Sequence, residues 1–273
     1  MRKILAILVC KFVRFIGTFF GKGSSLPGRY ALKICPDILR CVKLPEDIIA
    51  VTGSNGKTST VEMIAKILTK SGKRVVYNVE GSNQIEGVTT MILSNCSVFG
   101  KLKADVLLIE SDERYTKYTF KYFSPKYYVI TNLYRDQLTR NGHPQWVYDA
   151  IDESISSDTT LLINADDPLV SCFGYNRKNT VYFGLDKCEI SKSEFSGIYN
   201  DGTYCPICSK PMEYDYYHYN HIGAYRCSEC DYKKSKTDYR NYVGSRFRSV
   251  KYHFHTLFSC KIKSTLSLKK AHQ

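Results

Sequence analysis

Residues 53–59 combine two glycines with a lysine and several hydroxyl side chains, which are the residue types of a phosphate-binding loop. Gly53 and Gly56 allow the backbone to turn N–H groups toward an anion, and a helix that begins near Lys57 adds the positive end of its dipole. Lys57 can reach terminal phosphates, and the Thr58 hydroxyl can bind Mg²⁺. The residues expected to bind ATP here are Gly53, Ser54, Asn55, Gly56, Lys57, Thr58 and Ser59.

The spacing of this loop is G-x-x-G-K-T. It is shorter than the commoner phosphate-loop pattern G-x-x-x-x-G-K-[ST], which would have its first glycine where Val51 stands. The position of the loop supports the phosphate interpretation. It follows a strand predicted within 46–53 and opens a helix predicted over 58–70, as binding at a helix N-terminus requires. A plain glycine turn is the alternative interpretation of the same residues.

A magnesium nucleotide also needs oxygen ligands at the carboxyl ends of neighbouring strands. The stretch "LLIESDERY" places Glu110, Asp112 and Glu113 where a predicted strand ends. We expect Glu110 to be the second Mg²⁺ ligand or to hold a water, and a solvated acidic turn is the alternative. Asn132 ends the next predicted strand, and we expect it to contact the nucleotide. Other polar residues of that segment that could face the same crevice are Asp136, Arg140 and His143.

Four of the eleven cysteines form two close pairs, C-x₂-C, then eighteen residues, then C-x₂-C. Each pair places two thiolates on one tight knuckle, and two knuckles complete a tetrahedron around Zn²⁺. The predicted zinc ligands are Cys205, Cys208, Cys227 and Cys230. Such a site is closed to water and substrate, so the expected role is structural, and an iron-sulfur cluster is the alternative.

The segment 199–239 is rich in Cys, Tyr and His but poor in Leu, Ile and Val, so it cannot build an ordinary apolar core. Metal binding would therefore supply folding free energy, with the aromatic side chains as a small core around the metal. We expect His218 and His221 to be exposed loop residues. A ribbon that stacks nucleic-acid bases is an alternative role for Tyr214, Tyr216, Tyr217 and Tyr219.

The elements that must position these residues are predicted strands separated by segments that can carry helices. Apart from the strand before the loop, apolar runs predict strands over 74–79, 104–111, 126–132, 160–166 and 180–184. Continuous apolar runs are typical of strands covered on both faces, so we expect a doubly wound α/β domain with a mostly parallel sheet. After the fourth of these runs, "NADDP" (164–168) predicts a helix N-cap or a nucleotide contact, and both remain open.

The predicted organisation has four parts: an amphipathic helix and leader over 1–44, an ATP-binding domain over 45–198, a zinc ribbon over 199–238 and a basic tail over 239–273. The leader segment "SSLPGRYALKICPDIL" is expected to be a connection punctuated by proline and glycine. The tail contains no acidic residue and no clear period, and we assign no domain to it.

The formal net charge of +13 suggests nucleic acid or an anionic membrane as a partner. Its distribution weakens the nucleic-acid interpretation, because residues 231–273 hold eleven Lys or Arg against Asp231 and Asp238. The remaining cysteines are scattered singly through apolar segments, where free Cys is a small hydrophobe. We therefore expect a reducing, cytoplasmic location.

The first 23 residues resemble a signal or anchor, but Lys11 and Arg14 leave two apolar runs that are far shorter than the ~20 residues of a spanning helix. No small-residue cleavage site follows. A basic amphipathic helix remains, and two positions are open for it. It either packs on the domain or lies on the inner face of the cell membrane.

Together, "VTGSNGKTST", "GSNQIEG", "LIESDE", "TNLYRDQLTRNGH", "NADDP" and "YFG" resemble the Mur ligase superfamily over about residues 24–240. The paired-cysteine ribbon after "YFG" narrows the resemblance to the branch of synthetase subunits that amidate lipid II. The implied fold is a Mur ligase central P-loop ATPase domain with an inserted zinc ribbon and a C-terminal domain that closes over the site.

This resemblance implies an ATP-dependent ligase of peptidoglycan synthesis. ATP phosphorylates the α-carboxylate of D-glutamate in the lipid II stem peptide, and ammonia from a GatD-type glutaminase partner then gives D-isoglutamine. Carried onto this chain, Lys57 and the loop amides hold the phosphates, while Thr58 and Glu110 bind Mg²⁺. Lipid II itself is a membrane-embedded substrate. No catalytic residue is assignable, because such residues are expected in the C-terminal domain.

The sequence departs from the family pattern at two places, in residues 142–160 and after the ribbon. Many Mur ligases place a carbamylated lysine before "NADD", whereas residues 142–160 contain no lysine, which argues against an amino-acid-adding ligase. The segment after the ribbon does not resemble the family's continuation, so we expect a shifted or shortened reading frame, a fragment, and missing strands at the sheet edge. The alternatives are an amino-acid-adding Mur ligase or folylpolyglutamate synthase-like ligase, and a nucleic-acid-binding zinc protein.

Overall fold

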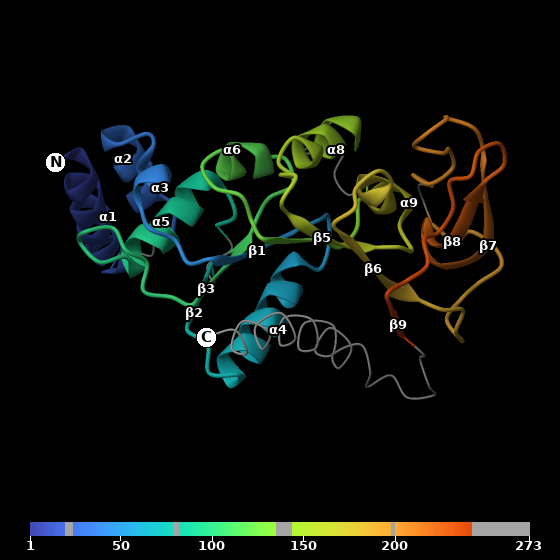
Figure 1. The fold of residues 1–273 in the computed structure, drawn as a ribbon, viewed down its shortest axis with the longest axis horizontal. Helices are drawn as coiled ribbons and strands as arrows, with labels where there is room; N and C mark the ends of the chain where they lie inside the picture. Colours follow the sequence, from blue (N-terminus) through green and yellow to red (C-terminus); the bar gives the residue numbers. More distant parts are fainter. Residues whose placement is uncertain (20–23, 79–81, 135–143, 198–199, 242–273) are drawn as a thin grey trace. The chain divides into compact units, whose positions relative to one another are not determined.

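The computed structural model describes residues 1–19, 24–78, 82–134, 144–197 and 200–241 (Figure 1). Within it the chain forms two compact units. The first unit comprises residues 1–52, 57–128 and 145–159, and the second comprises residues 53–56, 129–144 and 160–273.

The first unit contains three parallel strands in the order β2-β3-β1, with helices on both faces (Figure 1). Its elements are α1 (Arg2–Phe19), α2 (Leu26–Ile34), α3 (Ile38–Cys41), β1 (Asp47–Thr52), α4 (Lys57–Lys70), β2 (Val75–Tyr77), α5 (Ile85–Asn95), β3 (Val106–Glu110), α6 (Thr116–Phe120) and α8 (Pro144–Asp152). Strand β4 (Tyr127–Ile130) passes from the first unit into the second. The parallel pairings confirm the predicted α/β class.

The strand and helix around the phosphate loop lie where the sequence predicts them. Helix α4 begins one residue earlier than predicted and ends at Lys70, after which Gly72 takes a φ of +82°. A residue with that φ terminates a helix at little cost only when it is glycine. Strand β1 pairs with β3 from Asp47 opposite Val106 to Val51 opposite Glu110. This register brings the ends of β1 and β3 to the same edge of the sheet.

The predicted connection after the first helix is wrong, because residues 26–34 and 38–41 form helices. The prediction fails because it interprets Pro27 and Gly28 as signals of an irregular connection. Pro27 lies in the first turn of α2, where a missing backbone N–H costs nothing. Gly28 lies where α2 packs against α5, and its N–H donates to the Thr90 hydroxyl at 2.7 Å. Glycine here permits close approach of two helices rather than a turn.

We expect Gly28→Ala to lower the free energy of unfolding by about 1–3 kcal/mol, the range for overpacked cores. A Cβ at this position would lie 1.9 Å from the Glu86 carbonyl oxygen. That overlap exceeds the roughly 1 kcal/mol that alanine gains over glycine in a helix. Urea denaturation measures the change. Arg29→Ala on the same helix is the control, expected within about 0.5 kcal/mol of wild type, and an unchanged midpoint for Gly28→Ala would contradict the packing.

Helix α1 packs against α2 and α5 through Ala6, Ile7, Cys10 and Gly17 (Figure 1). Lys11 donates to the Ser94 carbonyl at 2.8 Å from this face. Burial raises the pKa of Cys10 to about 11, as expected for a cysteine that acts as a small hydrophobe. Among the helices of the described residues, none combines the length and the apolar character that crossing a bilayer requires.

The second unit contains parallel strands in the order β5-β6-β9 and a separate antiparallel hairpin, β7-β8 (Figure 1). Its elements are β5 (Thr160–Asn164), α9 (Pro168–Ser171), the 3₁₀ turn Cys172–Gly174, β6 (Thr180–Leu185), β7 (Met212–Tyr219), β8 (Ile222–Cys227) and β9 (Tyr239–Asn241). Strand β9 corrects one expectation, because the first three residues of the predicted tail extend the sheet beside β6. The rest of that tail, 242–273, lies outside the described residues.

Candidate nucleotide site and four-cysteine site

The phosphate loop is held in shape by the segment that follows β4, within the second unit. The Asn132 side chain accepts a hydrogen bond from the Asn55 N–H at 2.9 Å and donates to the Asn55 carbonyl at 3.1 Å. The Asn132 carbonyl accepts from the Ser54 N–H at 2.8 Å, and the Thr131 hydroxyl donates to the Asn55 carbonyl at 2.8 Å. Asn132 therefore supports the loop, and its direct contact with a nucleotide stays a prediction.

The two loop glycines are required for different reasons. Gly53 has a φ of +129°, and a Cβ there would lie 2.2 Å from the Thr131 hydroxyl. Gly56 has a φ of +80° and meets no atom within 4 Å of its hypothetical Cβ, so only its backbone angle calls for glycine. The first position thus needs space as well as backbone freedom. Both Thr58 and Ser59, at the start of α4, are exposed, as ligand-binding hydroxyls must be.

Within the first unit, Lys57 lies against the acidic end of β3. Its ammonium group is 3.2 Å from a Glu113 carboxylate oxygen, and both side chains are largely buried. Glu110 is 3% exposed, and its backbone is clamped on both sides by the Asn78 side chain at 2.8 and 2.9 Å. One Glu110 carboxylate oxygen is buried and has no hydrogen-bond partner among the described residues. An oxygen in that state fits a cation ligand, since a buried carboxylate needs compensation.

The other carboxylate of this turn is engaged by an arginine. Arg114 donates to both oxygens of Asp112, at 3.0 and 2.8 Å. Burial raises the pKa of Asp112, but the Arg114 hydrogen bonds and charge outweigh it and leave that pKa lowered. Asp112 is thus already neutralised, which favours Glu110 over Asp112 as the carboxylate for a metal ion.

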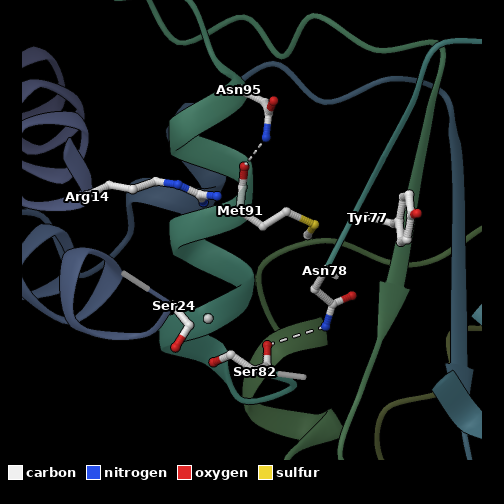
Figure 2. A pocket seen from close by; sticks show the side chains of 8 residues that line it. Arg14, Ser24, Tyr77, Asn78, Ser82, Met91 and Asn95 are labelled. Carbon is white, nitrogen blue, oxygen red and sulfur yellow. Dashed lines mark hydrogen bonds between the residues drawn. The ribbon is translucent and has the colours of Figure 1, made fainter. Parts of the chain in front are cut away.

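A small pocket lies beside Asn78 (Figure 2). Asn78 also donates to the Ser82 carbonyl at 3.3 Å, and Arg14 extends toward the pocket across α5 (Figure 2). The lining residues are Arg14, Ser24, Tyr77, Asn78, Ser82, Gly87, Met91 and Asn95. The sequence offered no signal for Asn78, because its role depends on a strand that lies far along the chain.

The four paired cysteines converge as predicted. Their sulfur atoms all lie within 4.8 Å of one another. Cys208 Sγ is 3.4 Å from Cys227 Sγ and 3.5 Å from Cys230 Sγ. Each knuckle also aims backbone N–H groups at a sulfur, with Ile207 donating to Cys205 Sγ at 3.4 Å and Glu229 to Cys227 Sγ at 3.4 Å. This donor set fits a tetrahedral thiolate site for Zn²⁺.

Within the second knuckle, the surroundings of Cys227 favour its thiolate. A backbone hydrogen bond from Tyr232 lowers the pKa of Cys230, but burial and the neighbouring Cys208 and Cys227 outweigh it and leave that pKa raised. Burial raises the pKa of Cys227, but backbone N–H donors and the neighbouring cysteines outweigh it and lower that pKa to about 6. Around the sulfurs, Tyr225 and Tyr232 are buried together with half-buried Met212 and Tyr214, which confirms the predicted aromatic core of this segment. Of the four tyrosines in the base-stacking interpretation, Tyr214 lies in this core and Tyr217 stacks on it with ring centroids 4.4 Å apart. Two of the four rings are therefore engaged in packing, which disfavours that interpretation.

The prediction that His218 and His221 are exposed is wrong, since they are 5% and 0% exposed. Both histidines lie at the turn end of the β7-β8 hairpin, where their side chains are buried. The His221 ring packs against Tyr134 with ring centroids 5.1 Å apart, and its Nε2 is 3.5 Å from Asp167 Oδ1. His218 Nδ1 is 3.1 Å from the Ser191 hydroxyl. Neither contact is visible in the sequence, because the partners lie many residues away.

Asp167 joins the hairpin to the segment that supports the loop. It is fully buried, and its Oδ1 accepts from the Leu169 and Val170 N–H groups, which confirms the predicted N-cap of α9. Its Oδ2 accepts from the Leu133 N–H at 2.9 Å. The adjoining Asp166 pairs with Lys234 at 2.6 Å, and its backbone carbonyl accepts from the Gly223 N–H at 2.8 Å. The "NADDP" motif therefore anchors the hairpin. Asp136, Arg140 and His143 lie outside the described residues.

Residues 51–226 match the Mur ligase middle domain, and the chain therefore belongs to the Mur ligase family. It is 36% identical over 244 residues to the lipid II isoglutaminyl synthase (glutamine-hydrolyzing) subunit MurT of Staphylococcus aureus (strain COL), covering 88% of this chain and 54% of that protein. The MurT subunit of Streptococcus pneumoniae (strain ATCC BAA-255 / R6) is 33% identical, with 88% and 53% covered. The chain thus spans about half the length of these relatives.

Solved structures agree on the fold. The pseudomurein peptide ligase type C of Methanothermus fervidus superposes with a TM-score of 0.59 at 29% identity, covering 75% of this chain and 39% of the other. The MurF ligase of Thermotoga maritima in complex with ADP superposes with a TM-score of 0.51 at 17% identity, covering 87% and 50%. The second likeness bears on the fold alone.

Proposed function

We propose that this chain is the nucleotide-binding part of an ATP-dependent ligase that amidates lipid II. The observation that carries the proposal is the 33–36% identity to two MurT subunits over most of the chain. The phosphate loop, the acidic end of β3 and the four-cysteine cluster support it. All three are features that a MurT-like synthetase would need or carry, and the absence of lysine from 142–160 disfavours an amino-acid-adding relative.

In the proposed reaction, the α-carboxylate of D-glutamate in the stem peptide takes the γ-phosphoryl group of ATP, and ADP leaves. Ammonia then attacks the acyl phosphate, and inorganic phosphate leaves as the amide of D-isoglutamine forms. A GatD-type glutaminase subunit supplies the ammonia from glutamine. We infer a cytoplasmic enzyme that works at the inner face of the cell membrane, because its proposed substrate is embedded in that membrane.

The chain's own residues would supply positioning and charge neutralisation, which dominate phosphoryl transfer. The amides of 53–56 and the start of α4 cradle the phosphates. Thr58 and Glu110 hold Mg²⁺, which neutralises charge on the phosphate oxygens when it is bound. Lys57 exchanges its Glu113 partner for a phosphate oxygen. Glu113 therefore keeps the ammonium group extended and ready before ATP arrives.

The four cysteines are proposed to hold Zn²⁺ in a structural site. All four coordination positions come from the protein, so the metal would organise residues 200–238 rather than take part in amidation. The backbone N–H donors to the sulfurs support this assignment, because they stabilise thiolates.

We expect Lys57→Met to weaken the affinity for Mg·ATP by on the order of 10- to 100-fold, the value of one charged hydrogen bond. Isothermal titration calorimetry with a non-hydrolysable ATP analogue and MgCl₂ measures it. Lys66→Met is the matched control, since Lys66 lies exposed on the same helix. Wild-type protein that is folded but has no Mg²⁺-dependent affinity for ATP would exclude the nucleotide site.

A second experiment separates amidation from amino-acid addition. With lipid II and a GatD-type glutaminase present, ADP release should require glutamine and should not respond to free amino acids. Mass spectrometry of lipid II should show the loss of about one mass unit that replacing hydroxyl by amine produces. ADP release driven by a free amino acid would instead favour the alternative ligases.

A further inference from the structure

Helix α1 carries a continuous apolar stripe on the face opposite its packed side. At about 100° per residue, the exposed apolar positions fall within an arc of about 120° that lies opposite the buried positions. The members of the stripe are Ile4, Leu5, Leu8, Phe12, Phe15, Ile16 and Phe19, with exposures of 41%, 53%, 47%, 64%, 65%, 40% and 72%. The stripe runs about 22 Å along the helix at 1.5 Å per residue. Scattered surface apolar residues need no explanation, but an ordered stripe of this kind does.

Segments that pack beside α1 also carry exposed apolar side chains. Phe99 is 77% exposed in the loop before β3, and that loop lies against the first turns of α1, where a Cβ at Gly100 would meet Lys3. Leu26 and Tyr30 of α2, which packs beside α1, are 40% and 45% exposed. Exposed apolar side chains therefore also occur on the segments that pack beside α1.

The charged residues on α1 and α2 indicate which kind of partner binds the stripe. The first 36 residues contain seven Lys or Arg and no Asp or Glu. Arg2, Arg29 and Lys33 are exposed on α1 and α2. A second copy of the chain would bring these like charges together, so it is a poor partner for the stripe. The segment 242–273 has basic residues and no acidic ones, so it is a poor partner for the same reason. An apolar stripe that shares its two helices with exposed cations and with no acidic residue instead complements an anionic lipid surface.

We propose that α1 lies in the interface of an anionic membrane, with its apolar stripe in the acyl-chain boundary and the exposed Arg2, Arg29 and Lys33 among the lipid headgroups. The helix does not span the bilayer. It holds the first unit against the surface in the manner of an interfacial anchor. This docking does not depend on nucleotide binding or on the amidation reaction, and it goes beyond them.

The test is co-sedimentation of the full chain with vesicles made of equal parts phosphatidylcholine and phosphatidylglycerol, without nucleotide or lipid II. Wild-type protein should bind these vesicles and should bind pure phosphatidylcholine at least about tenfold more weakly, since each basic residue near an anionic surface adds affinity. The double variant Phe12→Glu/Phe15→Glu should lose at least about tenfold in partitioning, because two rings leave the interface and two negative charges enter.

The control is Trp146→Glu, which replaces an aromatic side chain of similar exposure, 70%, on α8. This variant should bind like wild type. Absence of wild-type binding would overturn the proposal, and so would unchanged binding by the double variant, which would assign the affinity to the basic residues of 242–273. Light scattering that finds a wild-type dimer and a monomeric double variant would also overturn it and assign the stripe to self-association. None of these results bears on the ligase proposal, because no ligase substrate is present.

Discussion

Removal of the proposed Zn²⁺ from the four-cysteine cluster is expected to unfold the hairpin segment 200–238, with a loss on the order of 10 kcal/mol of metal-dependent folding free energy. The segment has little else to hold it. Its core is a handful of tyrosines and the cysteines themselves. Without Zn²⁺, four thiols within 4.8 Å of one another would repel one another as thiolates or need protons, and the knuckles would lose their shared centre.

Hydrogen exchange followed by mass spectrometry measures this effect peptide by peptide. Peptides from 200–238 should lose protection when a chelator is added and regain it with ZnCl₂, while peptides from α5 change little. Cys230→Ser should reproduce the chelated state. Cys188→Ser is the matched control, because Cys188 is half-buried near the hairpin and lies outside the cluster. Purified protein that is protected over 200–238 yet free of metal would refute the structural zinc site.

Asp167→Ala is expected to destabilise the second unit by about 3–5 kcal/mol, the cost of removing one partner from a buried charged network. The side chain is fully buried and accepts hydrogen bonds from three backbone N–H groups, those of Leu133, Leu169 and Val170. Alanine would leave all three without that acceptor and would open space beside His221.

Urea denaturation, monitored by the exchange of peptides from 160–197, measures this loss. Asp167→Asn should lie between wild type and Asp167→Ala, since the amide keeps one acceptor oxygen and turns the other position into a donor. Asp158→Ala, at an exposed aspartate, should change stability by less than about 0.5 kcal/mol. A loss for Asp167→Ala no larger than that of Asp158→Ala would show that the network contributes nothing.

The parts of the structure that depend on neighbours in sequence could be predicted well. The loop at 53–59 is recognisable because its glycines, lysine and threonine lie within a few residues of one another. The apolar patterns on either side of the loop predict the strand and the helix. The paired cysteines are equally local. In each case the chemistry and the element that positions it lie within one short stretch of chain.

The parts that depend on distant partners could not be predicted. A proline followed by a glycine, as at positions 27 and 28, occurs both in turns and at the start of tightly packed helices. Only the packing of α5 against this segment shows that it is a helix here. His221 is polar and follows a turn, so its burial depends on Tyr134 and Asp167 closing over it. Strand β9 is three residues long and polar, and it becomes a strand only through pairing with β6.

With the proposed Zn²⁺ in the cluster, the hairpin tip has a consequence for cells that run short of zinc. His221 and Tyr219 rest on Tyr134, whose N–H donates to the Ser54 hydroxyl in the phosphate loop at 2.8 Å. Trace-metal starvation would therefore first loosen a structural appendage and then the cradle for the nucleotide. The proposed nucleotide site would become sensitive to a micronutrient that takes no part in nucleotide binding.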